Sequence, residues 1–289
     1  MNFCSANKQK DNFLGIIDKN SIEEWILPHL SVGARGFKPN VPLYQIVMVI
    51  FYRLKTGCQW RELPIKQYIT DVDMSWQNIY HHFNEWSKDG SWQRVWIELL
   101  RSNYKYLDLS CVQLDGSHTI ARGGGEAVGY QGRKSNETTN SLFLADNTGQ
   151  MLAISTPQEG QHHDLYHIQS LFDELCEVLK LAGVDVRGLF MNADPGFDSK
   201  EFRSICIQKE IEANIKTNPR NSIQDEEEYQ YFDDELYKKR IVIEQANAWI
   251  DSYKALLIRF EKKVINWISL HWMAFSVRFI NKINKQRKV

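Results

Sequence analysis

Short apolar runs alternate with amphipathic segments after residue 110, and this alternation constrains the fold more than any other feature. It predicts, in chain order, a strand at 111–115, a hairpin at 141–158, a helix at 162–183, a strand at 187–194, a helix at 199–210, a strand at 211–216 and a helix at 237–261. Strands that alternate with helices form α/β domains, and a hairpin adds antiparallel pairing to the parallel crossovers. The sequence therefore predicts an α/β domain with a mixed sheet over 109–289.

The first hundred residues differ from the rest of the chain, because their apolar residues follow helical periodicity only. Four helices are predicted, over 21–30, 41–57, 75–90 and 91–107. Ser21 and Glu24 stand at the spacing of a capping box, and Gly57 is a plausible end for the second helix. We therefore expect residues 1–108 to form an all-α domain.

The helix predicted over 75–90 has two contrasting faces. One face is aromatic and apolar, and the other carries amide and histidine side chains, which include Gln77, Asn78 and His81. A polar helix of this kind suits a helix-turn-helix-like domain that binds DNA. A plain helical bundle with an aromatic core is the alternative, and the pattern alone leaves both open. His81 and the adjacent His82 diverge by about 100° around a helix, so they cannot chelate one metal ion together.

Composition narrows the class of protein. The chain has 289 residues and a formal net charge of −1, so its bulk charge does not indicate a nucleic-acid partner. Its five cysteines form no CxxC pair, which favours reduced thiols in a cytosolic protein. No apolar stretch approaches the roughly 20 residues that cross a bilayer, and residues 1–15 lack the apolar core of a secretory signal. We expect a cytoplasmic protein without a membrane partner.

Charge is distributed unevenly near the C-terminus. No acidic residue follows Glu261, whereas seven basic residues do: Lys262, Lys263, Arg278, Lys282, Lys285, Arg287 and Lys288. Such a basic tail is either a solvated chain end or a site that binds phosphate groups. The sequence leaves both interpretations open.

Three acids occupy comparable places in the α/β domain. Asp115 ends the first predicted strand, Asp194 ends the strand at 187–194, and Glu244 lies on the last predicted helix. Carboxylates at the carboxyl ends of neighbouring strands project into one crevice, where they repel unless protons or cations neutralise them. Oxygen ligands at an open site suit Mg²⁺ or Mn²⁺, and two such ions about 4 Å apart promote phosphoryl transfer. An ordinary surface turn is the competing interpretation of the "NADPGFDS" stretch.

The segment "RGGGEAVGYQGRKSN" at 122–136 is rich in glycine and in cations. Arg122, Arg133 and Lys134 could approach phosphate groups there, since glycines allow close contact with the backbone. The segment lacks the spacing of a nucleotide-binding P-loop, so ATP is not expected. A flexible polar loop without a ligand is the alternative.

Several motifs together resemble DDE insertion-sequence transposases of group five. "QLDGSHT", "DPGFDS" and "YKKRIVIEQANAW" resemble the family's three acidic motifs, and Tyr237, Arg240 and Glu244 fit the spacing of the last one. "EGQHHDLYHI" is similar to a glycine-x-His-Asp stretch of the family. "RLKTGCQWRELP" and "WQNIYHHFNEWSKDGSWQRVW" resemble its N-terminal helical domain. The resemblance covers about residues 22–275.

The resemblance implies a fold, a reaction and partners. The fold is RNase H-like, with a mixed five-stranded sheet flanked by helices and preceded by the helical domain. Asp115, Asp194 and Glu244 would be the catalytic acids that bind Mg²⁺ or Mn²⁺, as two ions. The enzyme would cut and join transposon ends, acting on terminal inverted repeats and target DNA as a homodimer in the bacterial cytoplasm, at the nucleoid.

The same resemblance assigns further residues. Tyr237, Arg240 and Lys254 would contact DNA, with Lys254 on the face of Glu244, because Asp251 stands where the family has a basic residue. Asp198 is expected to structure its turn and not to bind metal.

Two rival functions remain open from the sequence. One is a domesticated DNA-binding protein that no longer cuts, and the other is an RNase H-like nuclease that hydrolyses without strand transfer. The three acids disfavour the first rival, because a protein that only binds DNA needs no metal site. They do not separate a transposase from the second rival, because a nuclease of this fold would have a similar metal site.

Overall fold

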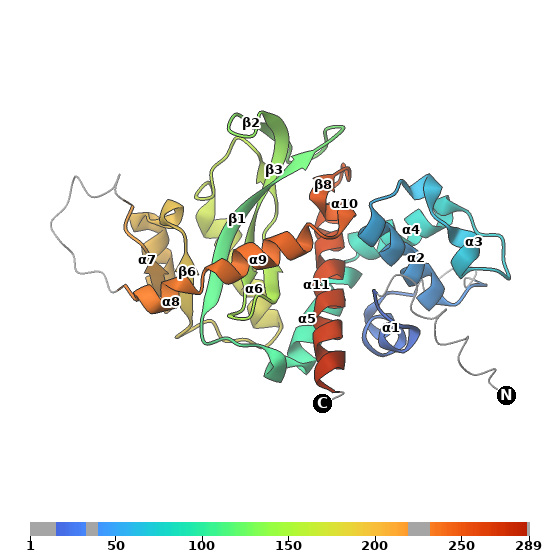
Figure 1. Cartoon of the computed structure of the whole chain (residues 1–289), viewed down its shortest axis with the longest axis horizontal. Coiled ribbons are helices and arrows are strands. Elements are labelled where there is room, and N and C mark those ends of the chain that lie inside the picture. The colour runs from blue at the N-terminus through green and yellow to red at the C-terminus, as the bar shows by residue number, and fades with distance from the viewer. Residues whose placement is uncertain (1–15, 33–39, 219–231, 288–289) are drawn as a thin grey trace. The chain divides into compact units, whose positions relative to one another are not determined.

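The computed structural model describes residues 16–32, 40–218 and 232–287, which divide into two units (Figure 1). One unit is helical and takes in residues 1–102 together with 251–289, and the other contains the sheet and spans 103–250. The first boundary lies close to the expected one at 108. The C-terminal segment differs from the expected division, because its long helix packs on the N-terminal helices.

The helical unit is built mainly from helices of both chain ends. Its elements are α1 (Lys19–Trp25), η2 (Leu27–His29), α2 (Leu43–Thr56), η3 (Trp60–Glu62), α3 (Ile65–Tyr68), α4 (Trp76–Lys88), α5 (Ser91–Ser102), α10 (Lys254–Leu257), β8 (Ile258–Arg259) and α11 (Val264–Gln286). Helix α11 contacts α2, α4, α5 and α10. Trp92, Trp96 and Trp267 are buried in this core.

Helix α11 changes the interpretation of the basic tail. Most of this segment is a buried helix and not a solvated chain end, since Phe275 and Phe279 on α11 pack against Trp96. At its end Arg287 forms an ion pair with Glu24 at 3.0 Å. Lys262 and Lys263 are exposed before α11 begins. Lys288 lies outside the described residues.

Two helix ends test the sequence signals directly. Helix α1 is capped by Asp18, whose carboxylate accepts the Ser21 N–H at 2.8 Å, so the capping box predicted at Ser21 is wrong. Helix α2 ends at Gly57 as predicted, with φ at 66°. A side chain at Gly57 would come within 2.9 Å of the Lys254 carbonyl group, which explains why glycine is needed there.

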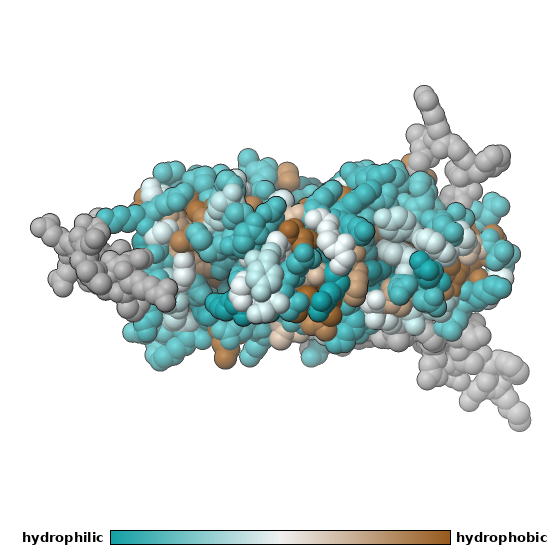
Figure 2. Space-filling view, turned by 90° about the horizontal axis from the view of Figure 1, so that it is seen from above, coloured by the Kyte–Doolittle hydropathy of each residue, from teal (hydrophilic) through white to brown (hydrophobic). Residues whose placement is uncertain are grey.

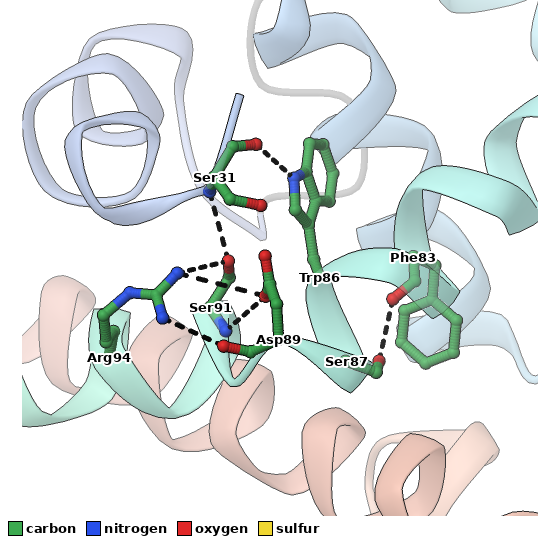
Figure 3. Close-up of polar contacts among 7 residues, drawn as sticks. All are labelled: Ser31, Phe83, Trp86, Ser87, Asp89, Ser91 and Arg94. Carbon is green, nitrogen blue, oxygen red and sulfur yellow. Dashed lines mark hydrogen bonds and ion pairs between the residues drawn. The ribbon is translucent and has the colours of Figure 1, made fainter. Parts of the chain in front are cut away.

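The α4–α5 corner is fixed by a polar network (Figure 3). Trp86 Nε1 donates to the Ser31 carbonyl oxygen at 2.9 Å, and the Ser31 N–H donates to Ser91 Oγ at 3.1 Å. Asp89 caps α5 by accepting the Ser91 N–H at 2.9 Å, while Arg94 donates to Ser91 Oγ at 2.8 Å. This network fixes the start of α5 against α4. The residues of α4 predicted to be polar and outward are exposed: Gln77, Asn78 and His81.

Burial of His271 on α11 predicts a pH-dependent stability. His271 is 2 % exposed, its Nδ1 lies 3.0 Å from the Trp267 carbonyl oxygen, and burial lowers its pKa to about 4. The unfolded chain binds this proton below a pKa of about 6.5, so falling pH favours unfolding. We expect the free energy of unfolding to fall by about 2 kcal/mol between pH 7 and pH 5 from this group. Urea titrations of the wild type and His271→Met measure it. An equal pH dependence in both proteins would contradict the prediction.

The sheet is mixed, as predicted, and its main path is five strands wide, although further strands pair outside this path. Its path runs β2 (Gly129–Gln131), β3 (Asn136–Ala145), β1 (Val112–Ala121), β6 (Phe190–Ala193) and β7 (Glu212–Ile215). Strands β4 (Met151–Ile154) and β5 (Gln158–Glu159) also pair with β3. The β1–β3 and β3–β4 pairs are antiparallel, whereas β1–β6 and β6–β7 are parallel.

Among the described residues of this unit, four helices accompany the sheet: α6 (Ile168–Leu181), α7 (Lys200–Gln208), α8 (Asp234–Lys238) and α9 (Ile241–Ile250). This unit also contains two short 3₁₀ turns, η4 (Tyr104–Tyr106) and η5 (Pro195–Phe197). Helix α6 packs on β3 and β4, and α9 packs on β1 and β3, crossing in front of them in Figure 1. Phe172 on α6 and Phe202 on α7 are buried and lie edge to face in the core.

Three predictions about this unit need correction. Asp115 lies inside β1 and not at its end, because pairing with β3 continues β1 as far as Ile120. The segment 122–136 is not wholly a loop, since β2 forms within it. The helix predicted over 237–261 is broken into α8, α9 and α10, so Lys254 does not continue the helix of Glu244. A turn at residues 251–253 causes the break, and Tyr253 is extended.

The face seen in Figure 2 carries scattered apolar side chains on a largely hydrophilic background. Ile207 on α7 is the most exposed large apolar residue among those described, at 75 %. None of the described helices combines the length and hydrophobicity that a bilayer crossing requires.

Candidate active site

The register of the parallel strands brings Asp115 and Asp194 to the same level. Gln113 pairs with Asn192 at the last register position between β1 and β6, and each acid lies two residues further along its strand direction. Asp194 starts the η5 turn, where its Oδ1 accepts the Gly196 N–H at 2.8 Å. Although β1 continues past Asp115, the acid still lies at the carboxyl end of the parallel part of the sheet. Both acids therefore follow the paired parallel segments of β1 and β6 at the same register.

Helix α9 and the turn before it bring further groups to Asp115. Arg240 Nη1 lies 3.6 Å from Asp115 Oδ1, and Arg240 Nη2 lies 3.1 Å from Glu244 Oε1. Asn247 Nδ2 donates to Asp115 Oδ2 at 3.0 Å. Glu244 is thus linked to Asp115 through the Arg240 guanidinium, and its own side chain is 59 % exposed.

Asn247 was not among the predicted site residues. It follows Glu244 by three positions, so the two lie on one face of a helix. This spacing from Glu244 was the feature of the sequence that could have identified Asn247 as a site residue.

The environment of Asp115 disfavours its negative charge. Burial raises the pKa of Asp115 to about 7; the Arg240 guanidinium opposes this rise, and the nearby charges of Asp194 and Asp164 add to it. The side chain of Asp115 is only 18 % exposed. A cation near Asp115 would therefore stabilise its ionised form.

Asp164 is a fourth acid near the site that the sequence reasoning did not assign. Its Oδ1 accepts Asn140 Nδ2 at 2.8 Å. A Cβ atom on Gly116 would lie 2.2 Å from the same Oδ1, so the glycine beside Asp115 admits this carboxylate. Side chains alternate along a strand, so Asp164, which lies against Gly116, is on the face of β1 opposite to the Asp115 side chain. Asp164 acts on Asp115 through its charge. In the sequence, the "QHHDL" stretch was the feature that could have identified Asp164 as a residue near the site.

Tyr237 completes the Tyr-Arg-Glu arrangement. Burial raises the pKa of Tyr237; the Arg240 guanidinium opposes this rise, and the charge of Asp194 adds to it. Tyr237 therefore lies close to both Arg240 and Asp194. The three residues of this predicted motif occupy neighbouring positions, with Arg240 in the middle.

The acids suit a hard divalent cation by their chemistry. Asp115, Asp194 and Glu244 offer carboxylate oxygens, which Mg²⁺ and Mn²⁺ prefer. Within residues 16–32, 40–218 and 232–287, however, no three Asp, Glu, His or Cys side chains already form a metal centre. The Glu244 carboxylate is paired with Arg240. These carboxylates suit the ion; in the structure Asp115 is held by Arg240 and Asn247, Glu244 by Arg240, and Asp194 accepts the Gly196 N–H.

The other residues predicted to bind DNA are divided between the two units. Arg122, Arg133 and Lys134 are exposed between β1 and β3, and Lys134 Nζ donates to the His118 carbonyl oxygen at 2.6 Å. Lys254, Gln77, Asn78 and His81 belong to the helical unit and are described with it.

Asp198 has the structural role expected of it. The side chain is 8 % exposed and forms an ion pair with Arg203 at 2.8 Å. Its second oxygen accepts the Asn218 N–H at 2.7 Å, which ties the segment after β7 to the turn after Asp194. These contacts occupy the carboxylate within the fold.

Comparisons with known families agree with the motifs. A family model described as a DDE superfamily endonuclease matches residues 107–281, and a model described as a putative transposase of the IS4/5 family matches residues 21–96. A search of curated proteins found no match. Together with the strand order, the first match establishes the predicted RNase H-like fold.

Solved structures with distant similarity are complexes of the Mos1 transposase. The paired-end complex with the left transposon end and a pre-cleavage transpososome each show 12 % identity and a TM-score of 0.29, over 88 % of this chain and 82 % of theirs. The strand transfer complex shows 13 % identity with the same TM-score and coverage. Similarity this distant does not place individual residues.

Proposed function

Because the chain belongs to the DDE superfamily of endonucleases, we propose that it is a DNA transposase that cleaves insertion-sequence ends and joins them to target DNA. The observation that carries the proposal is the placement of Asp115 and Asp194 at one level of the sheet, with Glu244 linked to Asp115 through Arg240. Isolated surface acids would not share a register or a common cationic partner. The catalytic acids of the proposal are therefore Asp115, Asp194 and Glu244.

These acids would hold two Mg²⁺ or Mn²⁺ ions, which when bound activate water or a DNA 3′-hydroxyl and stabilise the leaving oxygen. Asn247 fixes one oxygen of Asp115, which orients the carboxylate. Arg240 compensates the charges of Asp115 and Glu244 in the free protein and is positioned to contact a DNA phosphate. Tyr237 lies beside Arg240, whose charge acts on its hydroxyl.

DNA is the proposed partner of both units. Arg122, Arg133 and Lys134 are exposed cations near the sheet that suit phosphate contacts, and Lys254 adds one in the helical unit. Gln77, Asn78 and His81 present hydrogen-bonding groups on the exposed face of α4, which suits reading of terminal inverted repeats. Joining two ends requires two active sites, so we propose a homodimer on DNA, at the bacterial nucleoid.

The pKa of Asp115 predicts how metal affinity changes with pH. A pKa raised to about 7 means that the carboxyl is protonated below pH 7, and protons then compete with the ion. We expect the Mn²⁺ dissociation constant to rise about tenfold per pH unit below 7, and to level off above pH 8. Mn²⁺ binding measured calorimetrically between pH 5.5 and 8.5 checks this. A flat profile across that range would contradict the prediction.

Cleavage of a labelled DNA end tests the proposed function. The purified full chain is expected to nick DNA from the flanks of its own gene when Mg²⁺ is present, and EDTA should abolish the nicking. Binding without nicking would favour the rival non-cutting DNA-binding protein. Nicking without joining would favour the rival nuclease.

A further inference from the structure

Three buried side-chain amides cross three neighbouring strands at one level of the sheet. Gln113 on β1 is in register with Asn192 on β6, which is in register with Asn214 on β7. Asn192 Nδ2 donates to Gln113 Oε1 at 3.0 Å, and Asn214 Nδ2 donates to Asn192 Oδ1 at 2.8 Å. None of the three is more than 2 % exposed. We call Gln113, Asn192 and Asn214 the amide ladder.

The amide ladder is bonded to the backbone that begins α8. Asn192 Nδ2 also donates to the Leu236 carbonyl oxygen at 2.8 Å. Asn214 Nδ2 donates to the Asp233 carbonyl oxygen at 3.0 Å, and Asn214 Oδ1 accepts the Asp233 N–H at 2.8 Å. The side chain of Asn214 thus bonds Asp233 as the backbone of a neighbouring strand would.

Only a group with both a donor and an acceptor can make these paired contacts. An apolar side chain at position 214 would fill the space and leave the Asp233 N–H and carbonyl without these partners. Buried polar groups are costly when unpaired, so the amides select one position for the start of α8. The amide ladder therefore specifies where this segment lies on the sheet.

The amide ladder joins the segments that carry the three candidate catalytic acids. Asp115 and Asp194 follow Gln113 and Asn192 by two residues, and side chains two apart along a strand share a face. From α8 the chain leads through Arg240 to Glu244 on α9. The amide ladder thus connects the strands that carry two acids to the segment that carries the third.

We propose that Asn192 and Asn214 are positioning residues for DNA cleavage, an inference that rests on the proposed function. By fixing α8 on β6 and β7, they set where Arg240 and Glu244 lie relative to Asp115 and Asp194. Misplacement of a catalytic group by about 1 Å can lower a rate by about 10²-fold, so loss of this contact should slow the chemistry. Substrate affinity should change little, because neither amide belongs to the proposed DNA surface.

Asn214→Leu is the sharper variant, since Asn214 is remote in sequence from all three acids. It removes one bond to Asn192 and two to Asp233. In the full-length protein we expect kcat for cleavage of a DNA end to fall about 10²-fold with KM unchanged within about twofold. Hydrogen exchange of the backbone over 233–250 should accelerate at the same time.

Ser155→Ala is the matched control. It removes two hydrogen bonds at the opposite edge of the sheet, a buried one from the Leu142 N–H and a part-buried one to the Thr156 carbonyl oxygen, compared with three for Asn214→Leu. We expect it to lower stability and to leave kcat and the exchange of 233–250 unchanged. A loss of kcat equal to that of Asn214→Leu would overturn the proposal, because general destabilisation would then explain both.

The wild type provides a test that needs no variant. The Asp233 N–H precedes α8, and we expect it to exchange slowly because Asn214 Oδ1 accepts it. Fast exchange at Asp233, or unchanged exchange over 233–250 in Asn214→Leu, would overturn the positioning role. A wild type that cleaves no DNA would instead refute the proposed function, while the exchange data still decide whether the amide ladder holds α8.

Discussion

Asp194→Asn is expected to reduce DNA cleavage by roughly 10³-fold or more, while DNA binding remains. The substitution keeps the shape of the side chain and an oxygen that can still accept the Gly196 N–H. It removes the negative charge that would hold a divalent ion beside Asp115. Metal ions contribute several kcal/mol to phosphoryl transfer, and about 4 kcal/mol corresponds to a factor of 10³.

Asp185→Asn is the control for this change. Asp185 is an exposed acid in the same unit that pairs with Arg187. Its neutralisation alters the net charge equally, so cleavage and DNA affinity should match the wild type. Cleavage rates of wild type, Asp194→Asn and Asp185→Asn on one labelled DNA end provide the measurement. Equal rates for all three would remove Asp194 from the chemistry.

Glu261→Gln is expected to destabilise the protein by about 3 kcal/mol or more. Glu261 and Arg53 are 7 % and 4 % exposed, and Glu261 Oε1 lies 2.9 Å from Arg53 Nη2. Trp60 Nε1 donates to the same oxygen at 3.2 Å. Burial lowers the pKa of Arg53 and the charge of Glu261 opposes this, so Glu261 compensates the charge of the buried guanidinium. Removing one partner of a buried ion pair leaves an uncompensated charge.

Two further variants separate this effect from ordinary loss of an ion pair. Glu98→Gln breaks a pair with Arg101 whose members are 30 % and 52 % exposed, and we expect a change within about 1 kcal/mol. The double variant Arg53→Met/Glu261→Met removes both buried charges and should recover most of the lost stability. Urea denaturation measures all of them. A Glu261→Gln loss no larger than that of Glu98→Gln would contradict the prediction.

Local patterns predicted most elements of the sheet unit. The hairpin was signalled by the turn at Gly149, which has φ at 79° as such turns require. The amphipathic periodicity located α6 and α7, although α6 begins at Ile168, later than the predicted start at 162. Asp194 could be placed because its strand ends in a proline–glycine turn. In each case the physical cause lies within a few residues of the signal.

The features that were missed depend on contacts between distant segments. The full length of β1 follows from its pairing with β3, which an isolated apolar run at 111–115 does not reveal. Asp164 reaches β1 because Gly116 has no side chain, and the two are 48 positions apart. The amide ladder joins Gln113 to Asn192 across 79 positions. Such contacts form only once the sheet has assembled, so no local pattern indicated them.

Strand transfer by a pre-cleaved end tests the central claim most directly. A DNA end carrying a free 3′-hydroxyl is incubated with the full-length protein, Mg²⁺ and a circular target, beside a matched end with a 3′-deoxy terminus. The proposed transposase is expected to join the 3′-hydroxyl end to the target and to leave the 3′-deoxy end unjoined, with no joining by Asp194→Asn. Target nicking without joining of the 3′-hydroxyl end would contradict transposition and leave a hydrolytic nuclease.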